Sequence, residues 1–169
     1  RECALHGLGV ANDVAGITNC DVALIGYRDM PHRYSRVARV FVLPSRSEGF
    51  SNALLEALSA GIPVMAVDGP WGARLVLDPV NATSEDPFPT HRMRFCEYGI
   101  LMPRLDVKEY DSVWVDAMCE VLKDPSLTEH YRHKGVGRVH DFSQAHCSAK
   151  WRGLLDRLDG VRRRKRINN

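Results

Sequence analysis

Residues 40–68 constrain the fold more than any other part of this chain. They comprise a short apolar run, a turn at Pro44 and Ser45, a loop that contains Gly49, a helix-length segment and a second apolar run. Two apolar runs joined by a helix predict a pair of parallel strands, because parallel strands need a long crossover connection over one face of the sheet. The sequence therefore predicts an α/β fold.

Four apolar runs are the candidate strands of this sheet. They lie at residues 22–25, 40–43, 63–67 and 99–102, and each is bounded by glycine, proline or aspartate. Continuous apolar runs of this length are typical of strands that are buried on both faces. We therefore expect a Rossmann-like parallel sheet with helices on both of its faces.

Four helix-length segments lie between or after these runs, at residues 33–38, 51–60, 107–123 and 144–158. The second has the clearest boundaries, because serine favours the start of a helix and glycine its end, here Ser51 and Gly61. The last two carry apolar residues at helical spacing, which we expect to pack in a core. These are Tyr110, Val113, Trp114, Ala117, Val121 and Leu122 in one segment, and Trp151, Leu154, Leu155 and Leu158 in the other.

The length and charge of the chain indicate one soluble domain. It has 169 residues, with 23 lysines and arginines against 21 acidic residues. Five of the basic residues stand together as Arg162, Arg163, Arg164, Lys165 and Arg166. We interpret residues 1–158 as one domain and 159–169 as a basic tail, which either lies free in solvent or touches an anionic membrane surface. The remainder is mildly acidic, which argues against nucleic-acid binding.

The cysteines and histidines form no recognisable site. The five cysteines are an odd number without CxxC spacing, and the seven histidines show no metal-ligand spacing, so we expect neither a disulfide framework nor a metal. No apolar run approaches the roughly 20 residues of a membrane span. These features favour a cytoplasmic protein. Residues 78–98 predict a long loop whose role the sequence leaves open.

The loop between the second and third apolar runs is the best candidate for a binding site. Ligands of open parallel sheets bind beyond the carboxyl ends of the strands, where this loop lies. Gly49 allows close approach, and the amides at the start of the next helix attract anions such as a diphosphate. Glu48, Asn52 and Glu56 can converge on the hydroxyls of a sugar or ribose. Alternatively, Asn52, Glu56 and Ser59 are simply the polar stripe of an amphipathic helix.

The string from Glu48 to Glu56 resembles the E-x7-E motif of retaining GT-B glycosyltransferases, glycosyl transferases group 1 or family 4 type. Further similar segments are residues 24–27, 44–45, 60–64 and 98–101 and Pro125, and the resemblance covers residues 20–155. It implies the C-terminal, donor-binding domain of such an enzyme. The expected ligand is a nucleoside-diphosphate sugar, with a UDP-sugar as our first expectation, and no cofactor or metal is required.

The resemblance also assigns roles to individual residues. Glu48 would be the catalytic residue near the sugar hydroxyls, and Glu56 would accept hydrogen bonds from the ribose. The amides of Gly49, Phe50, Ser51 and Asn52 would hold the sugar and diphosphate, beside Ser45. The turn at Gly26 and Tyr27 would receive the base.

Some features of the family have no counterpart here. An arginine and a lysine that neutralise the diphosphate are not found in residues 1–20, so the sheet is expected to lack its first strands. The acceptor-binding domain is also missing, and the chain alone is expected to transfer little. Leu75 stands where the family often has a glutamate, and we leave it out of the site. For Arg74, an ion pair or a surface position is expected rather than a phosphate contact.

The predicted activity is transfer of a hexosyl or N-acetylhexosaminyl group, with retention, to a saccharide or lipid-linked acceptor in polysaccharide or glycolipid assembly. The enzyme would work in the cytoplasm or at the inner face of the membrane. The alternatives are a non-catalytic nucleotide-sugar-binding module and an epimerase of nucleotide sugars with the same fold. A phosphorylase would need a lysine that holds pyridoxal phosphate, and binding of nucleic acid would depend on the basic tail.

Overall fold

The computed structural model describes residues 23, 25–45, 48–69, 72–82 and 92–167, with side chains as far as residue 160. The chain divides into two compact units, residues 1–31 and 32–169, and the described helices and strands all lie in the second. The predicted strand at 22–25 is wrong at Ala23 and Ile25, which are exposed and not in a strand, while Val22 and Leu24 lie outside the described residues. An apolar run becomes a strand only where a neighbouring strand pairs with its backbone.

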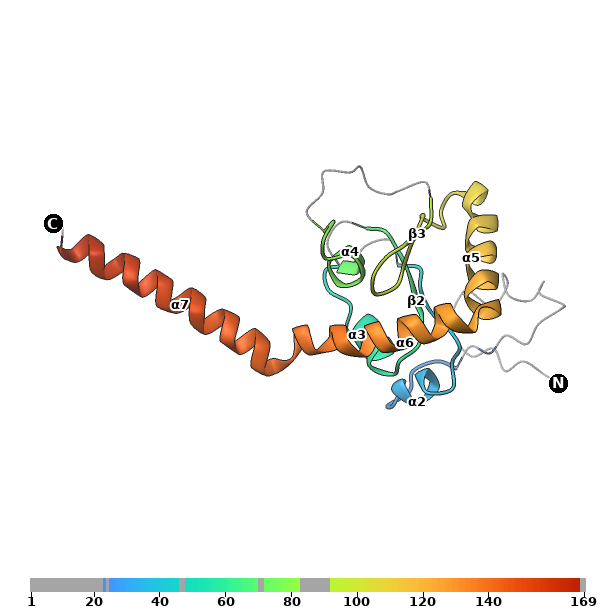
Figure 1. Ribbon diagram of the computed structural model, residues 1–169, viewed down its shortest axis with the longest axis horizontal. Coiled ribbons are helices and arrows are strands. Elements are labelled where there is room, and N and C mark those ends of the chain that lie inside the picture. The colour runs from blue at the N-terminus through green and yellow to red at the C-terminus, as the bar shows by residue number, and fades with distance from the viewer. Residues whose placement is uncertain (1–22, 24, 46–47, 70–71, 83–91, 168–169) are drawn as a thin grey trace. The chain divides into compact units, whose positions relative to one another are not determined.

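The described residues of the second unit form a four-stranded sheet in the order β1-β2-β4-β3. Figure 1 labels two of its strands, β2 and β3. Strands β1 (Phe41–Leu43), β2 (Val64–Val67) and β4 (Ile100–Met102) are parallel. They match three of the predicted apolar runs. Strand β3 (Arg94–Phe95) runs antiparallel to β4 and was not predicted, because two residues without an apolar run carry no strand pattern.

Burial within the sheet differs from the prediction at β1. Every residue of β2 and β4 is buried, as expected for central strands. The residues of β1 are only partly buried, so the expectation that it is buried on both faces is wrong. Among the described strands β1 lies at the edge and has β2 on one side, and an edge strand has fewer neighbours to cover it.

Helices cover both faces of the sheet, as predicted. The side chains of Val64 and Ala66 in β2 pack with α3 (Asn52–Ser59) and α4 (Gly72–Leu77). Those of Met65 and Val67 point the other way and pack with α5 (Asp111–Lys123). This alternation follows from the two-residue period of a strand. A parallel sheet with α3 and α4 on one face and α5 on the other is the result.

Helix α6 (Pro125–Val139) links the two faces, and no prediction was made for it. It packs on α3, where a Cβ atom added to Gly135 would stand 2.9 Å from Leu58 Cδ2, and its buried Tyr131 belongs to the cluster with α5. The apolar pattern of α6 is weak, but its start is well marked. The carboxylate of Asp124 accepts hydrogen bonds from the amides of Ser126 and Leu127, and Pro125 occupies the first turn.

The remaining elements are α2 (His32–Ser35), η1 (Lys108–Tyr110), η2 (His140–Phe142) and α7 (Gln144–Ile167). The predicted helices at 33–38, 51–60 and 107–123 correspond to α2, α3 and η1 with α5. The helix predicted at 144–158 continues through the basic run as far as Ile167.

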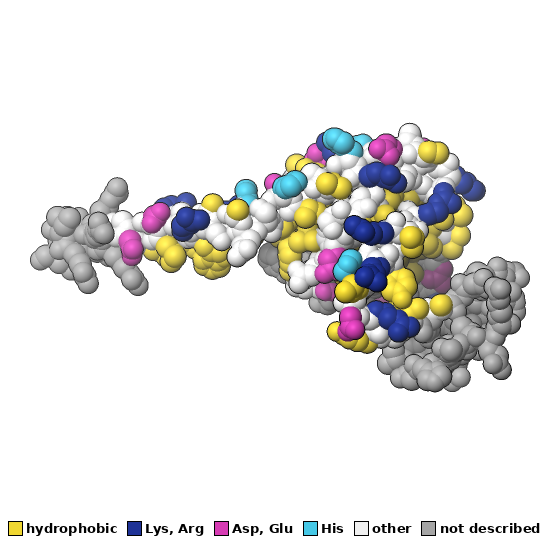
Figure 2. All heavy atoms as spheres, turned by 90° about the horizontal axis from the view of Figure 1, so that it is seen from below, with side chains coloured by type: hydrophobic (Ala, Val, Ile, Leu, Met, Phe, Trp, Pro, Cys, Tyr) yellow, Lys and Arg dark blue, Asp and Glu magenta, His cyan; other side chains and the backbone are white. Residues whose placement is uncertain are grey.

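The apolar residues of α7 are not packed, contrary to the prediction. Trp151 is 65% exposed, and Leu154, Leu155 and Leu158 are exposed as well. The main contact of α7 within the described part of the chain is with the short η2, which leaves this apolar face without a cover. Figure 2 shows hydrophobic side chains next to one another along the helix. No helix among the described residues is long and apolar enough to cross a membrane.

Candidate functional site

The candidate loop follows the carboxyl end of β1, where the sequence places it. Ser45 and Glu48 are half-buried, Gly49 and Phe50 are exposed, and Ser51 is buried. Residues 46 and 47 lie outside the described residues. The loop thus presents Gly49 and Phe50 to solvent while its last residue is anchored in the core.

The first turn of α3 is open to a ligand. Ser51 precedes the helix with an extended backbone, at φ −94° and ψ 108°, and its side chain makes no capping hydrogen bond. The predicted capping position is therefore right, but the hydroxyl does not satisfy the free amides of the first turn. Such amides carry partial positive charge and attract anionic groups. This arrangement suits a phosphate at the end of the loop.

The polar face of α3 points away from the core. Leu54, Ala57 and Leu58 are buried, whereas Asn52 and Glu56 are exposed. The hydroxyl of Ser59 donates a 2.7 Å hydrogen bond to the carbonyl oxygen of Glu56 within the same helix. Asn52 and Glu56 therefore lie where a ligand can reach them. The amphipathic pattern that formed the alternative interpretation is also present, so the pattern alone does not decide between the two.

Helix α4 touches the loop at Gly72, a contact that sequence reasoning missed. A Cβ atom added to Gly72 would lie 3.0 Å from the carbonyl oxygen of Glu48, 3.2 Å from its Cβ and 3.3 Å from the carbonyl oxygen of Gly49. Only glycine fits this approach without a shift of backbone atoms. The backbone of Glu48 is thus held directly against the start of α4. The glycine-rich segment 69–72 was the available signal, although glycine alone does not identify its neighbour.

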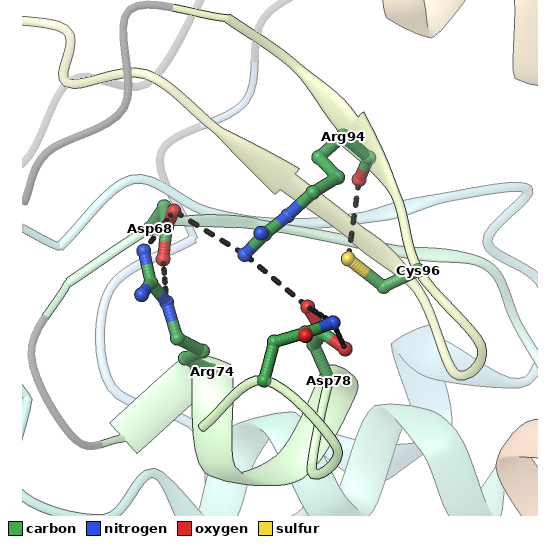
Figure 3. A network of polar contacts seen from close by, with 6 residues as sticks. Asp68, Arg74, Asp78, Arg94 and Cys96 are labelled. Atoms are coloured by element: carbon green, nitrogen blue, oxygen red, sulfur yellow. Dashed lines mark hydrogen bonds and ion pairs between the residues drawn. The ribbon is translucent and has the colours of Figure 1, made fainter. Parts of the chain in front are cut away.

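A buried ion-pair network lies at the carboxyl end of β2 (Figure 3). Arg74 is fully buried and donates two hydrogen bonds to Asp68, from Nε to Oδ1 at 2.8 Å and from Nη2 to Oδ2 at 2.7 Å. Arg94 Nη2 lies 3.2 Å from Asp78 Oδ2 and 3.7 Å from Asp68 Oδ2. Of the two alternatives expected for Arg74, the ion pair is present and the surface position is wrong, because the side chain is fully buried. This network holds α4 against the end of β2, and α4 in turn contacts the loop through Gly72.

Cys96 lies beside the same network and is not poised for chemistry. Burial, with a smaller contribution from the negative charge of Asp78, raises the pKa of its thiol to about 11. Its Sγ donates to the carbonyl oxygen of Arg94 at 3.4 Å. Because thiolates rather than thiols act as nucleophiles, Cys96 is a packing residue at neutral pH. Cys119 and Cys147 are also free, and Cys3 and Cys20 lie outside the described residues.

Two groups of predicted site residues lie outside the part of the structure that contains the loop and its described neighbours. Gly26 and Tyr27 belong to the first unit, where Gly26 has φ +61° and Tyr27 is 88% exposed. Their role as a receptor for the base stays a prediction. The side chains of the basic run, residues 162–166, lie beyond the described side chains. Within the described residues, no cluster of histidine, cysteine and acidic side chains is suited to a metal ion.

A protein-family model matches this chain and shows the family to which it belongs. The model described as glycosyl transferases group 1 matches residues 6–90, half of the chain. The chain belongs to this family. The match includes the loop, α3, β2 and α4, so the candidate site lies within the family's own sequence pattern.

Curated relatives of this family member are glycosyltransferases. An uncharacterized glycosyltransferase of Methanocaldococcus jannaschii is 26% identical over 80% of the chain and 36% of its own length. The N-acetylgalactosamine-N,N'-diacetylbacillosaminyl-diphospho-undecaprenol 4-alpha-N-acetylgalactosaminyltransferase of Campylobacter jejuni is 27% identical over 73% of the chain and 28% of its length. The poly(glycerol-phosphate) alpha-glucosyltransferase of Bacillus subtilis is 25% identical over 84% and 18%. The chain thus spans about a third or less of these relatives.

Among solved structures, the sucrose-phosphate synthase of Thermosynechococcus elongatus is similar, with a TM-score of 0.52 and 25% identity. The alignment covers 76% of the chain and 27% of that protein. This likeness, together with the parallel β1, β2 and β4, confirms the predicted α/β fold of a GT-B glycosyltransferase. The strand at residues 22–25, the burial of β1 and the packing of α7 differ from the prediction, whereas the fold class agrees with it.

Proposed function

We propose that this chain is the donor-binding part of a retaining glycosyltransferase and that it binds a nucleoside-diphosphate sugar at the start of α3. The observation that carries the proposal is the position of the E-x7-E string. Glu48 lies in the loop after β1 and Glu56 lies on the exposed face of α3, at the carboxyl edge of a parallel sheet where ligands of such sheets bind. Family membership supports the same reaction class.

Each residue of the loop then has a distinct task. The diphosphate would lie against the amides of Gly49, Phe50, Ser51 and Asn52, whose partial positive charge stabilises the leaving group. The carboxylate of Glu48 accepts hydrogen bonds from sugar hydroxyls near the reacting carbon.

Four further residues have roles in the donor site of this proposal. Glu56, one helical turn after Asn52, accepts from the ribose hydroxyls, since carboxylates are strong acceptors for paired hydroxyls. Ser45 would lie beside the sugar and diphosphate. The assignment of Gly26 and Tyr27 as the residues that receive the base rests on the family resemblance alone.

The identity of the donor and the stereochemistry of transfer are further parts of the proposal. We propose a UDP-sugar that carries a hexose or N-acetylhexosamine, with no metal or cofactor. Both named transferases from Campylobacter jejuni and Bacillus subtilis are described as forming alpha linkages. An alpha product from an alpha-linked nucleotide sugar corresponds to retention at the anomeric carbon, which supports the retaining assignment.

The acceptor is proposed to be a saccharide or a lipid-linked glycan. The name of the Campylobacter relative includes diphospho-undecaprenol, a lipid carrier. In that setting the basic residues 162–166 could touch anionic lipid, each with about 1 kcal/mol of attraction near such a surface. We place the enzyme at the cytoplasmic face of a membrane. In this proposal residues 1–158 are the donor domain, residues 159–169 are the basic tail, and an acceptor domain is supplied by another part of a longer protein.

Substitution of the two glutamates tests the proposal in the protein at its natural length. We expect Glu48→Ala to lower the turnover of sugar transfer about 100-fold, because a group near the reacting carbon is lost. We expect Glu56→Ala to raise the KM for the donor about tenfold, because a charged hydrogen-bond acceptor is lost. Glu120→Ala, an exposed glutamate on α5, is the matched control and should change neither value. Unchanged transfer in the first two variants contradicts the proposal.

The alternatives predict different results in the same assay. A non-catalytic binding module would bind the nucleotide sugar, seen by calorimetry against a panel of donors, but transfer nothing. An epimerase would convert the sugar of the donor without any acceptor, which analysis of the nucleotide sugar after incubation would reveal.

A further inference from the structure

The candidate loop has a second contact, on the side of η2. The ring of Phe50 meets the ring of Phe142, with 5.4 Å between the centroids and a tilt of 51° between the planes. Aromatic pairs favour this separation and a tilted geometry. Phe50 is otherwise 44% exposed. Phe142 therefore holds a side chain that would project into solvent from the loop.

Phe142 is itself held firmly, by Arg138 at the end of α6. The guanidinium carbon of Arg138 lies 4.8 Å from the centroid of the Phe142 ring and 5.1 Å from that of Tyr98. A cation over an aromatic face is attracted to its electron-rich surface. Arg138 Nη1 also pairs with Asp141 Oδ2 at 2.6 Å, and its side chain is only 11% exposed. The ring of Phe142 is thus packed on a nearly buried, fixed cation.

Arg138 ties this aromatic contact to α4. Its Nε donates to the carbonyl oxygen of Val76 at 3.0 Å, and its Nη2 donates to that of Leu75 at 2.8 Å. These carbonyls belong to the last turn of α4, where carbonyl groups lack partners inside the helix. The first residue of the same helix, Gly72, lies against Glu48. The loop is consequently held at Glu48 by the start of α4, and at Phe50 by a chain of contacts from the end of α4.

We propose that Phe142 is a positioning residue for the donor site and that it acts through Phe50. By holding the Phe50 ring, it fixes the backbone amides on either side of it, from Gly49 to Asn52, in the conformation that receives the diphosphate. A loop that is ordered before binding loses less conformational entropy when the ligand arrives. The inference rests on the proposed function, since it names a residue outside the E-x7-E string that sets the affinity of that site.

Titration of UDP by calorimetry into the protein at its natural length tests the proposal. We expect Phe142→Ala to weaken binding about 3- to 10-fold, because the loop must then be ordered by the ligand. Phe142→Tyr keeps the ring and should bind within twofold of the wild type. Phe95→Ala removes a similarly exposed ring from β3, at the other edge of the described sheet, and should bind like the wild type.

A double-variant comparison separates positioning from a general loss of structure. If Phe142 acts through Phe50, the variant that combines Phe50→Ala with Phe142→Ala should bind UDP no more weakly than Phe50→Ala alone. Multiplied effects of the two substitutions overturn the proposal. Circular dichroism at the titration temperature verifies that each variant is folded, and Phe142→Leu replaces Phe142→Ala under the same criteria if the alanine variant does not fold.

The result for Glu56→Gln distinguishes failure of this inference from failure of the proposed function. Wild-type affinity in Phe142→Ala together with weakened binding in Glu56→Gln overturns the positioning role alone. Absence of UDP binding by the wild-type protein at its natural length, or wild-type affinity in Glu56→Gln, overturns the proposed function and the inference with it.

Discussion

Helices α3 and α7 carry the same leucine spacing but differ in what covers it. Leu54 and Leu58 of α3 are four residues apart and fully buried, whereas Leu154 and Leu158 of α7 have the same spacing and are 39% and 51% exposed. Helix α3 lies between the sheet and α6, while the main described contact of α7 is with η2. The comparison shows that periodicity identifies the apolar side of a helix, whereas burial requires a second surface at the right place.

The strongest test of this difference uses two arginines, one from each environment. Arg74→Met should lower the free energy of unfolding by about 3–5 kcal/mol, because it leaves the buried carboxylate of Asp68 without its main partner. Arg157→Met on the exposed surface of α7 should change it by less than about 0.5 kcal/mol. Urea denaturation measures both. Similar losses in the two variants would show that α7 is as tightly integrated as the buried core.

The leucines provide the next test. Leu58→Ala should lower the free energy of unfolding by about 2–5 kcal/mol, because it removes a buried side chain and leaves a cavity between α3 and Gly135 of α6. Leu158→Ala should alter the unfolding free energy by at most about 0.5 kcal/mol. The same denaturation experiment applies. A large loss in Leu158→Ala would mean that a surface outside the described contacts covers α7.

The smallest expected effect concerns the helix that covers α3. The side-chain hydroxyl of Ser126 and the amides of Leu127 and Ser126 donate hydrogen bonds to Asp124, which lowers the pKa of its carboxyl. The charged form therefore stabilises the folded state above the unfolded pKa, and this contribution is lost as the pH falls through the folded pKa. Asp124→Ala should lower the thermal midpoint at neutral pH by less than Leu58→Ala does.

The pH profile gives this last prediction its control. The midpoints of Asp124→Ala and of the wild type should converge as the pH falls below the folded pKa of Asp124, because the carboxyl of the wild type is then protonated. A constant difference across that range would contradict a charge-based cap at the start of α6.

The central part of the fold could be predicted from the sequence because its signals are local. The continuous apolar runs of β2 and β4 and the Ser51 start of α3 gave correct elements. Helix α6 was missed since few of its residues are buried, Tyr131 and Gly135 among them, so its apolar pattern is faint. Strand β3 is too short to leave a pattern.

In the candidate site, too, contacts within one segment could be predicted from the sequence, whereas contacts between distant segments could not. The string from Glu48 to Glu56 is contiguous, so its residues could be proposed together. The contacts of Glu48 with Gly72 and of Phe50 with Phe142 join segments that are distant in the sequence. No spacing rule connects such pairs, because they depend on how α4 and η2 pack against the sheet. An ion pair was one of two alternatives expected for Arg74, and its partner Asp68 could be named only from the structure.

The close approach at Gly72 has a directional consequence for the loop. Since even a Cβ atom added to Gly72 would lie only 3.0 Å from the carbonyl oxygen of Glu48, the backbone of Glu48 has little room to move toward that helix. Any adjustment on ligand binding must carry it away from α4 or change its side-chain rotamer alone. The backbone at Glu48 is therefore restricted on the side of α4, and the loop can change its conformation mainly on the side that faces solvent.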